Sequence, residues 1–221
     1  MMLREAHGTF GGLSAITIGD PDAATVVVVL HGREMCGSDL APFAHSLGVP
    51  AYFVFPDAPL PCARGRSWWP VDSEARLRRL GGGPMDLWTM DPPGRAEARD
   101  RLDALLRQFA SRRRVLVGFS QGGMLAMDYV LHGGRVDGLA LLSSTRIAFA
   151  DWQPRLPRLA GLPVLVAHGR ADDELSFAAG EELRDAATSG GAEVRWLPFD
   201  GGHQIPLVVW RGLRQFLQGL I

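Results

Sequence analysis

The chain has 221 residues and a formal net charge of −1, with 47% hydrophobic and 21% charged residues. It is too hydrophobic for a disordered chain, and its balanced charge argues against a bulk field that attracts nucleic acid or anionic membranes. Cys36 and Cys62 are too few for a disulfide framework or a cysteine metal site. The N-terminus lacks the apolar run of a signal peptide, and no stretch reaches the roughly 18 apolar residues of a membrane span. We therefore expect a cytoplasmic protein without stable membrane insertion.

Short apolar runs alternate along the chain with longer helical periods. Continuous runs of this kind are typical of strands buried on both faces, as in a parallel sheet. They lie at 25–30, 51–55, 115–119, 139–142 and 163–167. Residues 193–197 alternate polar and apolar side chains, which indicates a strand nearer the edge of the sheet. Residues 13–18 also alternate and predict an antiparallel edge strand.

Apolar residues recur every three to four positions in two segments, Ala98–Phe109 and Val209–Leu220. The segment Met124–Leu131 is apolar on nearly all sides, so we expect this helix to be packed inside the protein. Strands that alternate with helices predict an α/β fold, with a mainly parallel sheet and helices on both faces. Because no linker or repeat divides the chain, we expect residues 1–221 to form a single domain without a separate cap.

The strongest motif is GFSQGG at 118–123, which directly follows a predicted strand and directly precedes the buried helix. A G-x-S-x-G motif in this context is the nucleophile elbow of α/β-hydrolases, where a sharp, strained turn exposes a serine above the sheet. Gly118 and Gly122 are needed because a Cβ atom there would collide with the neighbouring strand or helix. The helix N-terminus behind Ser120 presents free N–H groups where an oxyanion would form. Ser120 is therefore the candidate nucleophile.

A serine is a poor nucleophile unless a base lies within hydrogen-bond reach. His203, between the last predicted strand and the last helix, is the candidate base. Asp172 follows the strand at 163–167 and is the candidate orienting acid, with its neighbour Asp173 as an alternative. These positions follow the carboxyl ends of parallel strands, where open α/β sheets bind their ligands. The chain order Ser, Asp, His is the order of the α/β-hydrolase triad.

The oxyanion hole of this fold takes one N–H group from the residue after the nucleophile and one from the loop after an early strand. The segment LHGRE at 30–34 occupies the second place. We therefore assign the backbone N–H groups of Gln121 and Arg33 to the oxyanion hole. Gly32 would let the backbone approach the reacting carbonyl.

Residues 57–93 do not fit the alternation of strands and helices. They contain several prolines, the triplet GGG at 81–83 and three tryptophans, but no long periodic run. A loop-rich stretch of this length in a compact domain is more often functional than idle, so we expect it beside the active site. Trp68, Trp69 and Trp88 are the candidate substrate-binding residues; the alternative is that they only bury the loop against the domain.

Four motifs together resemble the phospholipase/carboxylesterase family of small α/β-hydrolases, which includes the acyl-protein thioesterases. They are LHG at 30–32, GFSQGG at 118–123, HGxxD at 168–172 and GHxIP at 202–206. The resemblance implies an α/β-hydrolase fold, esterase or thioesterase chemistry without a cofactor, and a triad of Ser120, Asp172 and His203. The loop REMCG at 33–37 departs from the small residues that family members usually carry there, which leaves the substrate class open.

We therefore expect a carboxylesterase that cleaves small-molecule esters through an acyl-enzyme, as a monomer or homodimer and without metal or cofactor. Two alternatives stay open. The first is a thioesterase or lysophospholipase that acts on longer acyl chains with the same catalytic groups. The second is a non-catalytic binding protein on a hydrolase scaffold, which the presence of Gly32 and of all three candidate triad residues disfavours.

Overall fold

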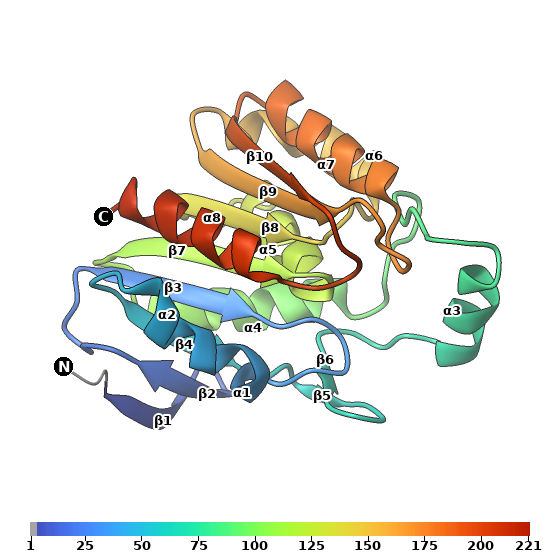
Figure 1. Ribbon diagram of the computed structural model, residues 1–221. Coiled ribbons are helices and arrows are strands. Elements are labelled where there is room, and N and C mark those ends of the chain that lie inside the picture. Colours follow the sequence, from blue (N-terminus) through green and yellow to red (C-terminus); the bar gives the residue numbers. More distant parts are fainter. Residues whose placement is uncertain (1–3) are drawn as a thin grey trace.

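The computed structural model describes residues 4–221 (Figure 1). The first three residues of the predicted domain, which also belong to the segment considered for a signal peptide, lie outside the described residues. Within residues 4–221 the main sheet has eight strands in the order β1-β2-β4-β3-β7-β8-β9-β10. The strands are β1 (Glu5–Phe10), β2 (Leu13–Ile18), β3 (Thr25–Leu30), β4 (Tyr52–Pro56), β7 (Arg113–Phe119), β8 (Gly138–Leu142), β9 (Pro163–Gly169) and β10 (Glu193–Phe199). A small separate ribbon pairs β5 (Leu60–Pro61) with β6 (Arg66–Ser67).

The six strands from β4 to β10 in this order run parallel, which confirms the predicted mainly parallel sheet. The alternating strand β10 lies at one edge, as its pattern indicated. The prediction for residues 13–18 was half wrong: β2 is antiparallel, but it is not the edge strand. Strand β1 pairs along its outer side and forms the edge. Its segment EAHGTF contains few β-branched residues and a glycine, so its propensity for a strand is weak.

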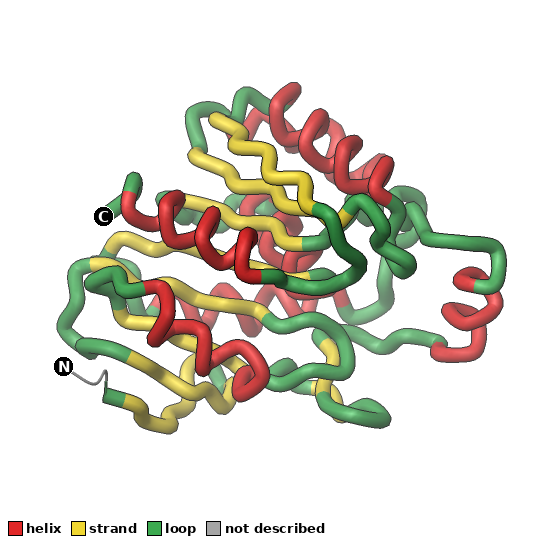
Figure 2. Tube along the Cα trace, in the orientation of Figure 1, coloured by secondary structure: helices red, strands yellow, loops and turns green. Residues whose placement is uncertain are grey.

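Helices cover both faces of the sheet (Figures 1 and 2). One face packs against α4, α5 and α7, and the other packs against α1, α2 and α8. The helices are α1 (Gly37–Leu40), α2 (Ala44–Leu47), α3 (Ser73–Leu80), α4 (Arg95–Arg107), α5 (Gln121–Leu131), α6 (Phe149–Trp152), α7 (Phe177–Ser189) and α8 (Leu207–Gln218), with 3-10 turns η1 (Ala41–Phe43) and η2 (Gln153–Leu159). Each face of the sheet carries its own hydrophobic core, and β3 contributes to both. Val26 and Val28 point to one face, while Val27 and Val29 point to the other.

The three predicted helices are confirmed as α4, α5 and α8, and every residue of α5 is buried. Sequence analysis did not identify α3 and α7. The buried face of α7 consists largely of alanine and glycine, so its hydrophobic period is weak. Helix α3 buries no residue at all. Among the residues that the structure describes, no helix is both long enough and apolar enough to cross a membrane.

A buried ionic cluster joins α4, α5 and α6 on one face of the sheet. Asp128 is fully buried and is the one charged residue of α5. Its carboxylate accepts hydrogen bonds from Arg95 at 2.5 Å, from Arg99 at 2.7 Å and from the indole N–H of Trp152 at 2.7 Å. A buried carboxylate needs such partners, since an isolated buried charge is costly. The cluster therefore holds α5, the helix that directly follows Ser120, in place.

Asp128, His132 and Asp151 also bring three potential metal-ligand atoms within 4.8 Å of one another. Arg95 donates to both carboxylates, at 2.5 Å to Asp128 and 3.1 Å to Asp151. A guanidinium cannot lose its charge in a protein, so it already supplies the positive charge that these carboxylates need. We interpret the group as part of the structural ionic cluster.

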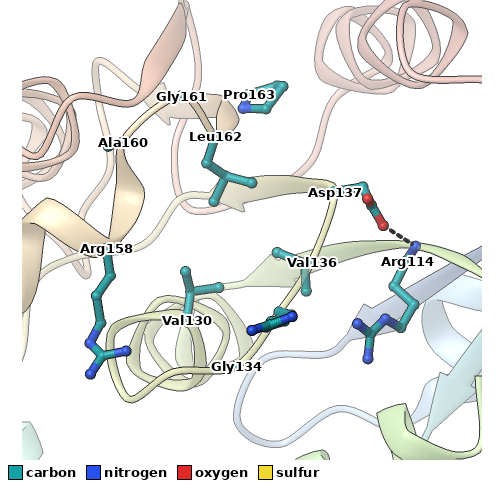
Figure 3. Close-up of a pocket in the computed structure, with 11 residues that line it drawn as sticks. Arg114, Val130, Gly134, Val136, Asp137, Arg158, Ala160, Gly161, Leu162 and Pro163 are labelled. Atoms are coloured by element: carbon teal, nitrogen blue, oxygen red, sulfur yellow. Dashed lines mark hydrogen bonds between the residues drawn. The ribbon is translucent and has the colours of Figure 1, made fainter. Parts of the chain in front are cut away.

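A cavity of about 530 Å³ lies at the end of the sheet where β7, β8 and β9 begin (Figure 3). Arg114 of β7 and Asp137 of the loop before β8 lie on its wall, and the backbone N–H of Arg114 donates to the Asp137 carboxylate at 2.8 Å. Ser120 lies beyond the opposite end of β7. This cavity is therefore separate from the site that the sequence predicts.

The ionic cluster predicts a large stability effect from a nearly isosteric substitution. Asp128→Asn removes the charge that faces Arg95 and Arg99, and should lower the free energy of unfolding by about 3 kcal/mol. Asp100→Asn on the exposed side of α4 is the control and should change it by less than about 0.5 kcal/mol. Urea unfolding measures both. Equal effects of the two substitutions would contradict a stabilising role for the cluster.

Candidate active site

Ser120 sits in a strained turn between β7 and α5. Its backbone has φ 52° and ψ −117°, which is unusual for a residue with a side chain. The Ser120 N–H donates to the Leu142 carbonyl of β8 at 2.9 Å, and the Ser144 hydroxyl donates to the Ser120 carbonyl at 3.0 Å. These bonds hold the turn, and strain of this kind persists only where the surrounding structure enforces it. The geometry is that of the predicted elbow.

Two glycines allow the turn to pack tightly. A Cβ atom on Gly118 would lie 2.3 Å from the carbonyl oxygen of Gly122, at the start of α5. A Cβ atom on Gly122 would lie 2.4 Å from the carbonyl oxygen of Leu30, at the end of β3. Backbone cannot yield at these distances, so both positions require glycine, as the sequence predicted. The glycines therefore bring the Ser120 turn directly against the loop that follows β3.

A continuous hydrogen-bonded chain connects Ser120, His203 and Asp172. His203 Nε2 lies 2.9 Å from Ser120 Oγ, and His203 Nδ1 lies 2.8 Å from Asp172 Oδ2. The three residues come from the β7–α5 turn, the loop after β9 and the loop between β10 and α8. The structure brings Asp172 to the histidine, whereas Asp173 is exposed. A nucleophile, a base and an orienting acid would have this arrangement.

The Asp172 carboxylate is buried, with 4% of the residue exposed. Its Oδ1 atom accepts the backbone N–H groups of Glu174 and Leu175, both at 2.9 Å. Burial acts to raise the pKa of Asp172, but hydrogen bonds from His168 and His203 oppose it and, with the Leu175 N–H, hold the pKa well below its usual range. Asp172 is therefore ionised at neutral pH and can orient an imidazole N–H.

The predicted oxyanion donors lie beside Ser120. Gln121 is the first residue of α5, and Arg33 lines the same cavity as Ser120. Within residues 4–221, neither backbone N–H donates to another protein group. The Arg33 guanidinium is turned to Glu34, with a 2.5 Å ion pair, and Glu34 has a positive φ of 63°. The backbone of the bulky loop after Gly32 therefore turns sharply at Glu34.

His31 fixes the loop that carries Arg33. Its Nε2 atom accepts the Ala58 N–H at 3.0 Å, so its Nδ1 carries the hydrogen and donates to the Gly32 carbonyl at 2.6 Å. Burial lowers the pKa of His31, and the ring is therefore neutral. His31 therefore shapes the loop after β3.

A cavity of about 540 Å³ opens next to Ser120 and His203. Its size suits a small-molecule ligand. More than half of its lining residues come from the loop-rich segment 57–93, including the inner side of α3. The apolar part of the wall consists of Trp69, Pro70, Val71, Ala75, Met85, Leu87, Met90, Pro92, Pro93, Phe119, Met124 and Leu175. The cationic and acidic side chains on the wall are Arg33, Glu34, Asp72, Arg76, Arg79 and Glu174.

The three tryptophans proposed for substrate binding lie in different environments. Trp69 lines the cavity. Trp68 is buried and lies outside the lining; its indole N–H donates to the His31 carbonyl at 2.8 Å, and its backbone N–H donates to Gln121 Oε1 at 2.9 Å. Trp88 is 47% exposed and also lies outside the lining. Trp68 therefore ties the loop to the elbow, a role that tryptophan spacing alone could not reveal.

The fold and this geometry can be compared with known proteins. A family model described as Phospholipase/Carboxylesterase matches residues 99–221. A protein of Bacillus subtilis (strain 168) named "Putative hydrolase MhqD" is 33% identical over 186 residues, which cover 81% of this chain and 86% of that protein. The chain belongs to the phospholipase/carboxylesterase family. It is therefore a hydrolase of the esterase and thioesterase type.

Solved structures agree with this family assignment. The crystal structure of esterase PE8 matches this hydrolase with a TM-score of 0.75 and 25% identity, over 100% of both chains. The Zea mays acyl-protein thioesterase 2 structure matches with a TM-score of 0.77 and 19% identity, over 93% of this chain and 97% of that chain. The second likeness concerns the fold alone. The predicted α/β-hydrolase fold is confirmed, and residues 4–221 contain no separate cap.

The depressed pKa of Asp172 predicts a pH-dependent contribution to stability. An unfolded Asp titrates near about 3.9, so this contribution is fully present above that pH and is lost as the pH falls toward the lower pKa of the folded state. When the pH falls from about 7 to about 3, the wild type should therefore lose unfolding free energy relative to Asp172→Asn, because the asparagine has no charge to titrate. Urea unfolding at both pH values measures it. A difference independent of pH would contradict the assignment.

Proposed function

We propose that this hydrolase is a carboxylesterase that cleaves esters through an acyl-enzyme on Ser120. The observation that carries the proposal is the hydrogen-bonded chain from Ser120 Oγ through both nitrogens of His203 to Asp172 Oδ2. The ionised Asp172 accepts from Nδ1, which leaves the lone pair of Nε2 directed at the serine hydroxyl. The strained backbone at Ser120 costs stability. Such a cost argues against a non-catalytic binding protein, which has no need for an exposed, hydrogen-bonded serine.

In the acylation step, Ser120 Oγ attacks the ester carbonyl carbon while His203 Nε2 takes the hydroxyl proton. The carbonyl oxygen becomes an oxyanion and accepts hydrogen bonds from the N–H groups of Arg33 and Gln121, which have no other protein partner in the described chain. The carbon–oxygen bond to the alcohol then breaks, and His203 gives its proton to the departing alcohol. Asp172 stabilises the imidazolium between these two transfers.

In the deacylation step, a water molecule takes the place of the alcohol. His203 removes its proton as the water oxygen attacks the acyl carbon, and the same two N–H groups stabilise the second oxyanion. The Ser120–acyl bond breaks, and His203 returns the proton to Ser120 Oγ. The acid product leaves and the site is restored. Every group in this cycle belongs to the chain, so the mechanism contains no step for a metal or cofactor.

The apolar wall of the cavity supports an acyl chain of medium length as the bound part of the substrate. Trp69, Met124 and Leu175 belong to this wall next to Ser120. Each methylene transferred from water to such a wall contributes about 0.8 kcal/mol, which is about a fourfold gain in kcat/KM. The same cavity also supports the second candidate, a thioesterase or lysophospholipase. It would bind the acyl chain, which an ester and a thioester substrate share, rather than the leaving group.

The proposed nucleophile predicts the outcome of an ester assay. Wild-type protein should hydrolyse p-nitrophenyl esters, and Ser120→Ala should lower kcat by at least about 10⁴-fold, because no other group can form the acyl-enzyme. Release of p-nitrophenol with acetate, butyrate, octanoate and palmitate esters measures the rate and the chain-length preference. Ser111→Ala, an exposed serine before β7, is the control and should match the wild type. Activity that survives in Ser120→Ala would overturn the proposal.

The cavity wall predicts a change in chain-length preference. Ala75 on α3 lines the cavity, whereas Leu77 on the same helix is 64% exposed and lies outside the lining. Ala75→Trp should lower kcat/KM for octanoate at least about tenfold while acetate changes little, because the new ring occupies the space of the longer chain. Leu77→Trp is the matched control and should leave both substrates unchanged. Equal effects of the two substitutions would show that α3 does not bound the acyl site.

A further inference from the structure

Asp172 has a second histidine beside it. His168, the second-last residue of β9, is fully buried. Its Nε2 atom lies 3.0 Å from the Leu175 carbonyl oxygen and 3.3 Å from Asp172 Oδ2. Both of these oxygens are acceptors, so Nε2 must carry a hydrogen and share it between them. The proposed mechanism assigns no role to this group.

The surroundings of the other ring nitrogen, Nδ1, indicate which tautomer His168 adopts. His168 Nδ1 is buried and has no hydrogen-bond partner in the described part of the chain. The backbone of α7 packs against it, since a Cβ atom on Gly180 would lie 2.4 Å from Nδ1, and the Phe177 ring lies 6.3 Å away, edge to face. A hydrogen on Nδ1 would be buried without an acceptor, at a cost of about 1–3 kcal/mol. The surroundings therefore favour the tautomer with its hydrogen on Nε2.

The hydrogen on His168 completes the set of donors around the carboxylate. Asp172 Oδ1 accepts two backbone N–H groups, and Oδ2 accepts from His203 at 2.8 Å. A carboxylate has about four acceptor positions, and His168 is the fourth donor. The ring also bonds the Leu175 carbonyl, and the Leu175 N–H in turn donates to Oδ1. One side chain thus connects the carboxylate to the loop that carries it.

We propose that His168 is a positioning residue, an Nε2–H donor that holds the Asp172 carboxylate and the Leu175 carbonyl together, so that Oδ2 stays directed at His203. The proposal rests on the proposed function, because His168 acts through Asp172 and has no contact with a substrate. His31 holds the oxyanion loop through the opposite tautomer. Each of the two buried histidines within residues 4–221, His31 after β3 and His168 near the end of β9, thus orients one half of the site.

A role in packing alone makes a different prediction from a role as donor. His168→Gln retains an N–H group close to the Nε2 position, whereas His168→Leu has similar bulk but no donor. If the donor matters, the leucine variant should lose kcat by about 10- to 100-fold with KM within about twofold, and the glutamine variant should retain most of kcat. Steady-state kinetics with p-nitrophenyl butyrate measure both. Equal losses in the two variants, or a loss in KM alone, would overturn the proposal.

A second measurement is independent of ester hydrolysis. In ¹⁵N-histidine NMR spectra of the wild type at neutral pH, His168 should carry its hydrogen on Nε2 and show an unprotonated Nδ1. The His203 Nδ1–H resonance should shift in the leucine variant and stay close to the wild type in the glutamine variant. A His168 ring that carries its hydrogen on Nδ1 and not on Nε2 would overturn the inference even if the leucine variant does not fold.

The two proposals can fail separately. A wild type without serine-dependent hydrolysis, but with the expected tautomer and the expected shift of the His203 resonance, would refute the carboxylesterase and leave the positioning role intact. Serine-dependent hydrolysis that is equally fast in the leucine variant would refute the positioning role and leave the carboxylesterase intact.

Discussion

The close approach of three backbone segments around Ser120 is the constraint on which the rest of the site depends. Gly122 lies against the carbonyl of Leu30, and Gly118 lies against the start of α5. Because no side chain fits between them, the strained serine is held next to the loop that follows β3. That contact brings the N–H groups of Arg33 and Gln121 to the same side of the sheet as the serine hydroxyl. The buried ionic cluster around Asp128 then anchors the helix behind the turn.

The acid half of the site is built by different means. Asp172 and His203 lie on loops, and loops need hydrogen bonds to keep a fixed geometry. Backbone N–H groups, His168 and His203 surround the Asp172 carboxylate, and these bonds outweigh the cost of its burial. The proposed nucleophile is thus positioned by close backbone packing, whereas the proposed acid and base are positioned by a polar network. This division explains why the elbow can be predicted from one short motif, whereas the HGxxD motif at 168–172 does not reveal which groups surround the carboxylate.

The parallel sheet, the elbow and the positions of the three polar residues could be predicted because each follows from local patterns: continuous apolar runs, a glycine–serine motif and loops that follow strands. The role of Trp68 could not, since it depends on bonds to His31 and Gln121, which are distant in sequence. Helix α3 buries no residue and therefore leaves no hydrophobic period. The sequence places His168 in the HGxxD motif, but its tautomer depends on the Leu175 carbonyl and on the packing of α7, which only the structure shows.

The central claim is that His203 and Asp172 activate Ser120. The most direct measurement is the labelling of native protein with a fluorophosphonate, followed by mass spectrometry of the modified peptide. The account predicts one adduct per chain, on Ser120, which is absent after denaturation and formed far more slowly in His203→Ala. An adduct on another residue, or labelling of Ser120 that is equally fast without His203, would contradict it.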